Sequence, residues 1–230
     1  MIISANQPYF APFPGFFYKA HLADIFVLLD DVQFPRGTTW ITRNRFKNDQ
    51  GTLWMTVPVH KKGLGLQNIN SVKIYHHGHW ARKHLASLQN AYAHAPYFEQ
   101  HLQFFATLFS QKYESLIDFN LAIIQYLIRV LNIDTKVILL SQLGIQARGN
   151  QLLVEICRTT GASRYLAQGP AQKYLDPHLF EQVGIKLEHF RQPALIYPQL
   201  WGSFIPNLSA FDLIFNCGPR AHDILTRAQS

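Results

Sequence analysis

The chain has 230 residues, of which 48% are hydrophobic and 15% are charged, and its formal net charge is +7. These values are typical of a globular protein with one sizeable core and exclude a disordered chain. No apolar run approaches the ~18 residues that span a bilayer, and no basic residue precedes the apolar start as it does in a signal peptide. The positive charge favours an acidic partner or substrate.

The distribution of the basic residues indicates which acidic partner to expect. They come in short groups without a recognisable nucleic-acid-binding module, which favours a phosphorylated small molecule or an acidic carrier protein over nucleic acid. The two cysteines, Cys157 and Cys217, cannot form a disulfide framework, which indicates a reducing compartment. We therefore expect a cytoplasmic protein without a membrane span that binds a small-molecule substrate.

The start of the chain predicts a βαβ unit. Ile2–Ala5 is a short apolar run, and Phe13–Ala23 carries apolar residues at helical spacing. Ile25–Leu29 is apolar without interruption, which suits a strand covered on both faces, as in a parallel sheet. We expect the two apolar runs to be neighbouring parallel strands, joined by the helix in a right-handed crossover.

The remaining pattern predicts a mixed, largely parallel Rossmann-like α/β sheet with a β-hairpin insertion and a helical segment. Alternation in Trp40–Phe46, and again after a turn at 48–51, predicts the hairpin. Ile69–Tyr75 resembles a further strand, and helical periodicity places the helical segment at about 78–132. No composition break separates these parts, so we expect one domain over residues 1–230.

Two loops leave the carboxyl ends of the first two predicted strands, where open α/β sheets bind their ligands. They are Asn6–Tyr9 and Asp30–Gln33. Because neighbouring parallel strands end at the same sheet edge, polar groups from both loops should converge there. Gln7, Tyr9 and Gln33 are therefore candidate substrate-binding residues.

Asp30 and Asp31 are the candidate catalytic residues. Successive residues of a strand point in opposite directions, so we expect Asp31 to face the cleft and Asp30 to face away. A carboxylate at this position can act as a general base, or bind a substrate amine or a metal ion. The alternative is a turn that ends the strand, with one aspartate bonded to backbone amides. The sequence leaves both alternatives open.

Arg43 and Arg45 lie on one face of the predicted hairpin strand. Their guanidinium groups can hold a phosphate or carboxylate through two parallel hydrogen bonds. The alternative is surface charge or pairing with nearby acids. Asn44, the third candidate binding residue here, points the other way and can share the cleft only if the strand twists or bulges.

Asp212 and Asn216 are spaced i, i+4 on the last full predicted helix, so they lie side by side. Such a polar stripe is usually solvated, but we expect it to line the same cleft as Gln7. A metal site is not predicted, because the histidines of His76–His79 lack the acidic or thiol companions of a closed zinc site. No cofactor is indicated.

A series of short motifs runs in one order along nearly the whole chain. In order, these are Gln7-Pro8-Tyr9 with Pro12 and Gly15, Asp30-Asp31-Val32-Gln33-Phe34, Trp40 with Arg43-Asn44-Arg45, Thr56-Val57-Pro58-Val59, Ala95-Pro96-Tyr97-Phe98, Tyr174-Leu175-Asp176, Tyr197-Pro198-Gln199, Leu208-Ser209 with Asp212, and Phe215-Asn216-Cys217-Gly218. The chain resembles the WbqC-like family through this ordered set. It departs from the family pattern at Thr42, at Ala167-Gln168 and at Ala210, so no role is assigned to the loop after Leu166.

The resemblance implies a role in bacterial surface-polysaccharide biosynthesis, such as that of the O-antigen of lipopolysaccharide. Within that role, we interpret the residues as a transferase site for an acyl or aminoacyl group and an amino sugar. A carboxylate would accept the amine proton, and the arginines would hold the phosphate of a nucleotide-linked or carrier-linked substrate. This reaction is our interpretation of the residues and not a property of the family.

Two alternatives remain. One is a nucleotidyl-transferring or adenylate-forming enzyme on a Rossmann-like fold, because Gly15 and His21 after the first strand are similar to the nucleotidylyltransferase superfamily. Its paired-histidine signature is absent. The other is a non-catalytic glycan-binding protein that uses Trp40, Trp54 and Tyr9 as stacking platforms. ATP consumption with pyrophosphate release would indicate the first, and saturable sugar binding without product the second.

Overall fold

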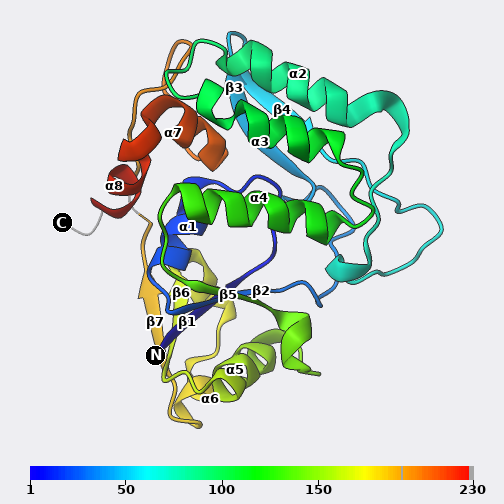
Figure 1. The fold of residues 1–230 in the computed structure, drawn as a ribbon. Coiled ribbons are helices and arrows are strands. Elements are labelled where there is room, and N and C mark those ends of the chain that lie inside the picture. The colour runs from blue at the N-terminus through cyan, green and yellow to red at the C-terminus, as the bar shows by residue number, and fades with distance from the viewer. Residues whose placement is uncertain (193, 228–230) are drawn as a thin grey trace.

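A computed structural model describes residues 1–192 and 194–227, and a five-stranded parallel sheet lies at its centre (Figure 1). Its strands are β1 (Ile2–Asn6), β2 (Ile25–Leu28), β5 (Lys136–Leu139), β6 (Arg164–Gln168) and β7 (Lys186–Phe190). The order across the sheet is β5-β2-β1-β6-β7. β1 pairs with β2 in parallel, with Ile3 opposite Ile25, which confirms the predicted βαβ unit.

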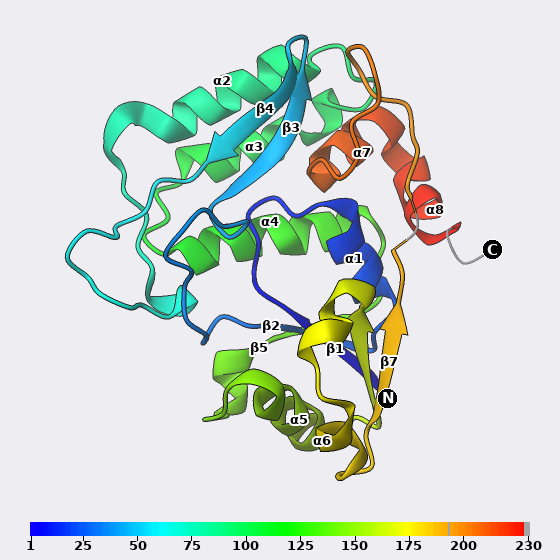
Figure 2. The ribbon, with the colours of Figure 1, turned by 180° about the vertical axis from the view of Figure 1, so that it is seen from behind.

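Helices cover both faces of this sheet (Figure 2). One face carries α1 (Pro14–His21) and α4 (Leu116–Val130), and the other carries α5 (Gly149–Thr160) and α6 (Pro177–Glu181). Phe26 and Leu28 of β2 pack into the first core, whereas Val27 packs into the second. Alternate side chains of one strand therefore enter two cores, which explains why its sequence is apolar without interruption.

A separate antiparallel hairpin and further helices form a layer above α4 (Figure 1). These elements are β3 (Arg43–Asn48), β4 (Gly51–Thr56), α2 (Trp80–Tyr92), α3 (Glu99–Ser110) and α7 (Ala210–Cys217). The last helix, α8 (Ala221–Thr226), follows α7 and packs against α1. The predicted combination of a Rossmann-like sheet and a hairpin is thus confirmed. Within the described residues, no helix combines the length and apolar character that crossing a membrane requires.

The predicted strand at Ile69–Tyr75 is wrong. The segment begins as a 3-10 turn at Ile69–Ser71 and makes only isolated bridges afterwards. Its backbone amides donate to carbonyl groups of three separate segments, at Asp30 and Val32, at Glu114 and at Pro58. No single strand runs beside it, so its buried and exposed side chains alternate without a ladder of hydrogen bonds.

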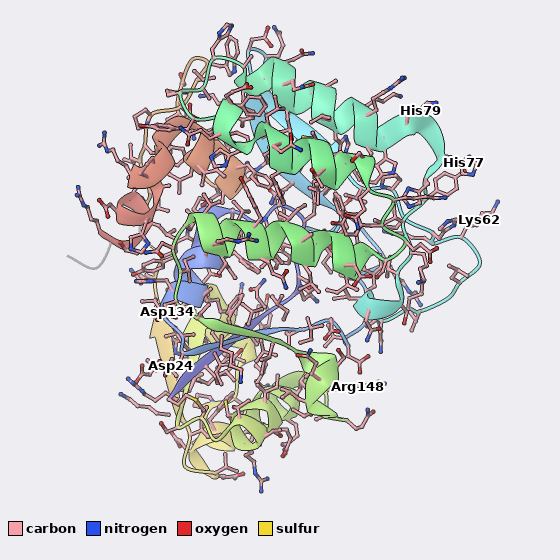
Figure 3. The ribbon with its side chains drawn as sticks, viewed as in Figure 1. Asp24, Lys62, His77, His79, Asp134 and Arg148 are labelled. Atoms are coloured by element: carbon pink, nitrogen blue, oxygen red, sulfur yellow. The ribbon has the colours of Figure 1, made fainter. Side chains whose placement is uncertain are left out.

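The order of the strands fixes where the sheet is open to a ligand. The chain places β2 and β5 on one side of β1, and then β6 and β7 on the other. The topology therefore reverses between β1 and β6, and a crevice forms at their carboxyl ends in folds of this kind. Asp24 and Asp134 precede β2 and β5 at the amino edge, whereas Lys62 lies on the opposite side of the molecule (Figure 3).

Candidate functional site

A buried asparagine joins the loop after β1 to the loop that connects β2 with β3, residues 29–42. Asn120 of α4 is fully buried, and its Nδ2 donates to the carbonyl oxygens of Pro8 at 2.9 Å and Ile41 at 2.8 Å. Each of these carbonyls belongs to one of the two loops. The loops thus lie together at the carboxyl edge of the sheet, where parallel topology brings them.

Asp30 and Asp31 have opposite surroundings. Asp30 is 2% exposed, and its carboxylate accepts hydrogen bonds from Ser141 N at 3.0 Å and Ser141 Oγ at 2.6 Å. Asp31 is half-buried, and its Oδ1 accepts from the side-chain amides of Asn68 at 2.8 Å and Asn70 at 3.1 Å. Asp31 Oδ2 has no hydrogen-bond partner among the described residues. Asp30 therefore joins β2 to the segment after β5, and only Asp31 presents an unused oxygen.

The other candidates on these loops border the edge without forming a network. Gln7 is half-buried, and its side chain makes no hydrogen bond within the described part of the chain. Tyr9 is half-buried with its ring centroid 6.1 Å from that of Phe16, and burial raises the pKa of its hydroxyl. Gln33 is exposed and forms an isolated bridge with Asn68. The side chains of Gln7 and Gln33 are available to a ligand and are not pre-oriented by hydrogen bonds among the described residues, whereas the Tyr9 hydroxyl is bonded to the Asn6 side chain.

Three basic residues share the outer face of β3, but two of them are already bound to the protein. Arg45 Nη2 donates to two carbonyl oxygens of the segment 199–207, at 3.1 and 3.2 Å, and Lys47 Nζ donates to a third at 2.7 Å. Arg43 makes no such bond, and its Cζ lies 3.8 Å from the centre of the Trp54 ring. The expected ligand contact of Arg45 is therefore corrected to an anchor for this segment, whereas Arg43 keeps its donors free.

Arg43 lies in a small hollow that we call the tryptophan pocket, lined by Thr38, Thr39, Trp40, Arg43 and Trp54, with a volume of about 140 Å³. Trp40 and Trp54 are 40% and 45% exposed, and their ring centroids are 5.9 Å apart at an interplanar angle of 28°. Two large indoles stacked at the surface are unusual, because tryptophan is mostly buried. The pocket thus offers aromatic faces and a guanidinium group together.

Asn44 does not reach this pocket, which corrects its expected role in substrate binding. It is 1% exposed, and its Nδ2 donates to the carbonyl oxygens of Phe10 at 3.1 Å and Ala11 at 2.7 Å. Its Oδ1 accepts from Arg45 N at 2.8 Å. The strand does not bulge to expose it, so Asn44 fixes the loop after β1 against the hairpin.

Asp212 and Asn216 are also placed differently from the expected cleft wall. Asp212 is fully buried and accepts from Tyr92 Oη at 3.2 Å, Tyr197 Oη at 3.2 Å and Asn216 Nδ2 at 3.3 Å. We call these four residues the Asp212 network. No hydrogen bond joins the network to Gln7 in the residues that the structure describes. The polar stripe is buried because the two tyrosines supply donors that the helix sequence does not reveal.

Burial dominates the electrostatics of this network. It raises the pKa of Asp212 to about 6, although the hydrogen bonds from the tyrosines and the charge of Lys47 oppose the shift. Burial and the nearby carboxylate raise the pKa of Tyr92 and of Tyr197 well above the ordinary value. Burial also lowers the pKa of Lys47. Both carboxylate oxygens of Asp212 accept bonds from within the protein, which is the arrangement of a structural network.

Two glutamine side chains lie at the switch point between β1 and β6. Gln192 packs directly on Gly15 in the first turn of α1, where an added Cβ would displace its side-chain amide. Gln168 Nε2 donates to Gln192 Oε1 at 3.5 Å. A hollow of about 390 Å³ adjoins Gln192, and Tyr197 of the Asp212 network forms part of its wall.

Neither cysteine nor histidine clusters add a reactive centre. Burial raises the pKa of Cys157 to about 12 and that of Cys217 to about 11, so both thiols stay protonated at neutral pH. His76 Nε2 is bonded to Tyr113 O at 2.7 Å. Among the described residues, no group of three or more His, Cys, Asp and Glu side chains is arranged to hold a metal ion.

Sequence reasoning did not identify Asn68 and Asn70, which orient Asp31, or Tyr92 and Tyr197, which enclose Asp212. These partners lie 37 and 39 residues from Asp31, and 120 and 15 residues from Asp212. No local spacing connects them. The two asparagines meet Asp31 because the chain turns at Ile69–Ser71, and the sequence predicts an extended strand there.

Comparison with known proteins relates these features to a family. The chain is 29% identical over 225 residues to the uncharacterized protein Rv1507c of Mycobacterium tuberculosis, covering 97% of this chain and 96% of that protein. No solved structure matches the chain. The WbqC-like protein family matches residues 7–224, which include both loops, the tryptophan pocket and the Asp212 network. The chain belongs to the WbqC-like protein family.

Proposed function

We propose that the protein is a transferase of bacterial surface-glycan biosynthesis that moves an acyl or aminoacyl group to the nitrogen of an amino sugar. The observation that carries this proposal is the Asp31 carboxylate. Its Oδ1 is fixed by two asparagine amides, and its Oδ2 is free of bonds to the described residues, at a sheet edge where such folds bind ligands. A carboxylate in this state is suited to accept a proton.

The reaction requires one proton acceptor near the amine. The sugar nitrogen attacks the carbonyl carbon of the donor, a C–N bond forms, and the bond from that carbon to the donor's sulfur or oxygen breaks. The leaving atom departs with the electron pair and takes up the proton that Asp31 has accepted from the nitrogen, directly or through water, so that the carboxylate is regenerated. The nitrogen becomes acidic as its new bond forms, so the Asp31 carboxylate is basic enough to take its proton. Positioning by Asn68 and Asn70 aligns the carboxylate for this transfer.

The charge of the protein supports an anionic substrate. The formal net charge is +7, and Arg43, at the start of the hairpin strand that follows the Asp31 loop, makes no side-chain hydrogen bond among the described residues. A nucleotide-linked sugar would supply phosphate groups, and an acyl group on an acidic carrier protein would supply a complementary surface. The competing glycan-binding function is supported by the exposed tryptophans, and it predicts binding without turnover.

The test is a screen with purified protein. Nucleotide-linked amino sugars and acyl or aminoacyl donors are combined in pairs, and products are analysed by mass spectrometry. We expect a product heavier by one acyl group, formed only when both substrates and protein are present. Release of pyrophosphate from ATP would instead indicate adenylate or nucleotidyl chemistry. Saturable sugar binding with no product for any donor would contradict the transferase.

A further inference from the structure

The tryptophan pocket is not required by the proton transfer assigned to Asp31, yet it is held in a defined shape. Thr39 closes a turn, with its Oγ1 accepting from Ile41 N at 3.2 Å and its carbonyl accepting from the amides of Thr42 and Arg43. The carbonyl of Trp40 accepts from Phe10 N at 2.9 Å. The backbone under both the indole and the guanidinium is therefore fixed before any ligand arrives, which lowers the entropic cost of binding.

Arg43 is the charged residue of the pocket, and its side chain stacks on Trp54 without a hydrogen bond to the described residues. Its Nε is buried without a hydrogen bond, and its guanidinium forms no ion pair among the described residues. Arg45, two residues along the same strand face, also has a buried Nε without a hydrogen bond, but its Nη2 donates to two carbonyl oxygens, whereas no atom of the Arg43 guanidinium has such a bond among the described residues. Buried donors without acceptors cost free energy, so an arginine in this state indicates an acceptor that is not part of the protein.

The surroundings of the pocket indicate that this acceptor is anionic. A second hollow of about 330 Å³, lined in part by Phe34, Arg36 and Lys61, is built on the same stretch of the β2–β3 loop. Lys61 Nζ lies 4.9 Å from the Phe34 ring centre and donates to Gly37 O at 3.4 Å. Lys62, the next residue in the chain, lies on the side of the molecule opposite Asp24 and Asp134 (Figure 3). Aromatic faces thus adjoin several positive charges.

We propose that the tryptophan pocket binds the nucleoside diphosphate group of a nucleotide-linked substrate. The base stacks on the exposed indole surface of Trp40 and Trp54, and the Arg43 guanidinium donates to an oxygen of the ligand. The diphosphate extends toward Arg36 and Lys61. This inference deepens the proposed function, on which it rests for the amino sugar attached to the diphosphate.

A neutral sugar is the other ring that a pocket of about 140 Å³ can hold, and it fits the charges less well. Sugar rings also stack on tryptophan, but they would leave the positive groups around Arg43 without an anion. A nucleoside diphosphate uses both features, since bases stack on aromatic side chains irrespective of sequence and phosphates form short hydrogen bonds with guanidinium groups.

The experiment measures binding without any acyl donor. Isothermal titration calorimetry is performed with UDP, dTDP, GDP, CDP and ADP on the wild type, Arg43→Gln and Trp54→Leu. For the diphosphate that binds most tightly, we expect each variant to raise Kd by roughly tenfold, because one loses a charge-assisted hydrogen bond and the other a stacking surface. Arg164→Gln is the matched control, because Arg164 begins β6 at the opposite sheet edge, and its Kd should match the wild type.

Three results would overturn the inference. The first is no binding of any nucleoside diphosphate, and the second is binding that Arg43→Gln and Trp54→Leu leave unchanged while thermal unfolding shows intact folds. The third is equally tight binding of inorganic pyrophosphate or of N-acetylglucosamine. Pyrophosphate binding would show that the positive charges alone hold the ligand, and N-acetylglucosamine binding would show that the tryptophans stack on a sugar ring. Diphosphate binding without acyl transfer in the separate screen would contradict the proposed function and leave this inference standing.

Discussion

The β2–β3 loop and the Asp212 network both gather polar side chains, but they differ in how much hydrogen-bonding capacity remains unused. In the network, the carboxylate of Asp212 accepts from three side chains and is fully buried. On the loop, Asp31 Oδ2 has no partner among the described residues, and Arg43 Nε is buried without one. The carboxylate of the Asp212 network has no unused oxygen, whereas Asp31 on the loop and Arg43 on the hairpin keep unused hydrogen-bonding atoms.

Unused hydrogen-bonding capacity therefore distinguishes polar residues that serve function from those that serve the fold. A buried polar group is stable when all its hydrogen bonds are made, so a network with complete hydrogen bonds can be explained by its contribution to the fold alone. A half-buried side chain that the protein holds through some of its atoms, while other polar atoms have no hydrogen bond, indicates that a ligand supplies the remaining bonds. Asp30 follows the first rule, and Asp31 and Arg43 follow the second. Arg45 lies between them, because its Nη2 is bonded to two carbonyl oxygens while its Nε is buried without a hydrogen bond.

The largest expected effect is on turnover in Asp31→Asn. Asparagine keeps the shape and can still accept from Asn68 and Asn70, but it cannot take a proton. Loss of a general base lowers the rate by roughly 10²–10⁴-fold. The measurement is kcat for acyl transfer by the purified variant, once a substrate pair is known.

Asp134→Asn is the control, because Asp134 is exposed at the amino edge and should keep full activity (Figure 3). Circular dichroism verifies that each variant is folded. Full activity in a folded Asp31→Asn protein would exclude Asp31 as the base. Asp30→Asn should lose stability and not the catalytic step, since Asp30 bonds to Ser141 in the interior.

The next effect concerns Asp212 and pH. Its pKa is about 6 in the folded protein, against an ordinary value of 3.8, so the folded state keeps a proton that the unfolded state releases between these values. The free energy of unfolding should therefore decrease as pH rises from about 4 to about 6, by roughly 3 kcal/mol. Asp212→Asn cannot ionise, so its stability should lack this decrease.

The measurement is urea unfolding of wild type and Asp212→Asn at several pH values, and the difference between the two curves is the quantity of interest. Other groups titrate in the same range. His101, whose pKa burial lowers to about 4, makes the protein more stable as pH rises. Such contributions are common to both proteins and cancel in the difference. Parallel curves across this range would show that Asp212 is not the buried acid described here.

Much of the fold was predictable because its signals are local. The unbroken apolar run of β2, the helical spacing of α1 and the alternation on either side of the hairpin turn each follow from a period that a short window reveals. The predicted strand at Ile69–Tyr75 was wrong because alternation of buried residues does not guarantee a partner strand. Its neighbours form only isolated β-bridges with it, and the sequence of the segment does not indicate this.

The candidate site was predictable only in part. The sheet-edge rule located the two loops, and the alternation of β3 placed Arg43 and Arg45 on one face. The state of each side chain depends on partners that are distant in sequence. Asn68 lies 37 residues from Asp31, and Tyr92 lies 120 residues from Asp212. The helical stripe of α7 therefore looked solvated, although two tyrosines enclose it.

A smaller effect separates Arg43 from Arg45 by stability. Arg45→Gln removes two bonds to the segment 199–207, and because this contact is partly exposed we expect a loss of about 1–2 kcal/mol. Arg43→Gln removes only the contact with Trp54, so its loss should stay below about 1 kcal/mol. Urea unfolding at pH 7 measures both. Equal losses would mean that Arg43 anchors the fold as Arg45 does.

The smallest effect is expected for Arg43→Lys in steady-state kinetics. Lysine keeps the charge but loses the planar fork and the stacking on Trp54, so it binds an anionic group less well. If Arg43 only anchors the substrate, ground and transition states weaken alike. KM should then rise by about 3–10-fold, while kcat stays within about twofold. Arg164→Lys at the amino edge provides the baseline. A fall in kcat at unchanged KM would show that the guanidinium contacts a group whose charge develops during the reaction. Arg43 would then act in the chemical step, as Asp31 does, and would not serve only to hold the substrate.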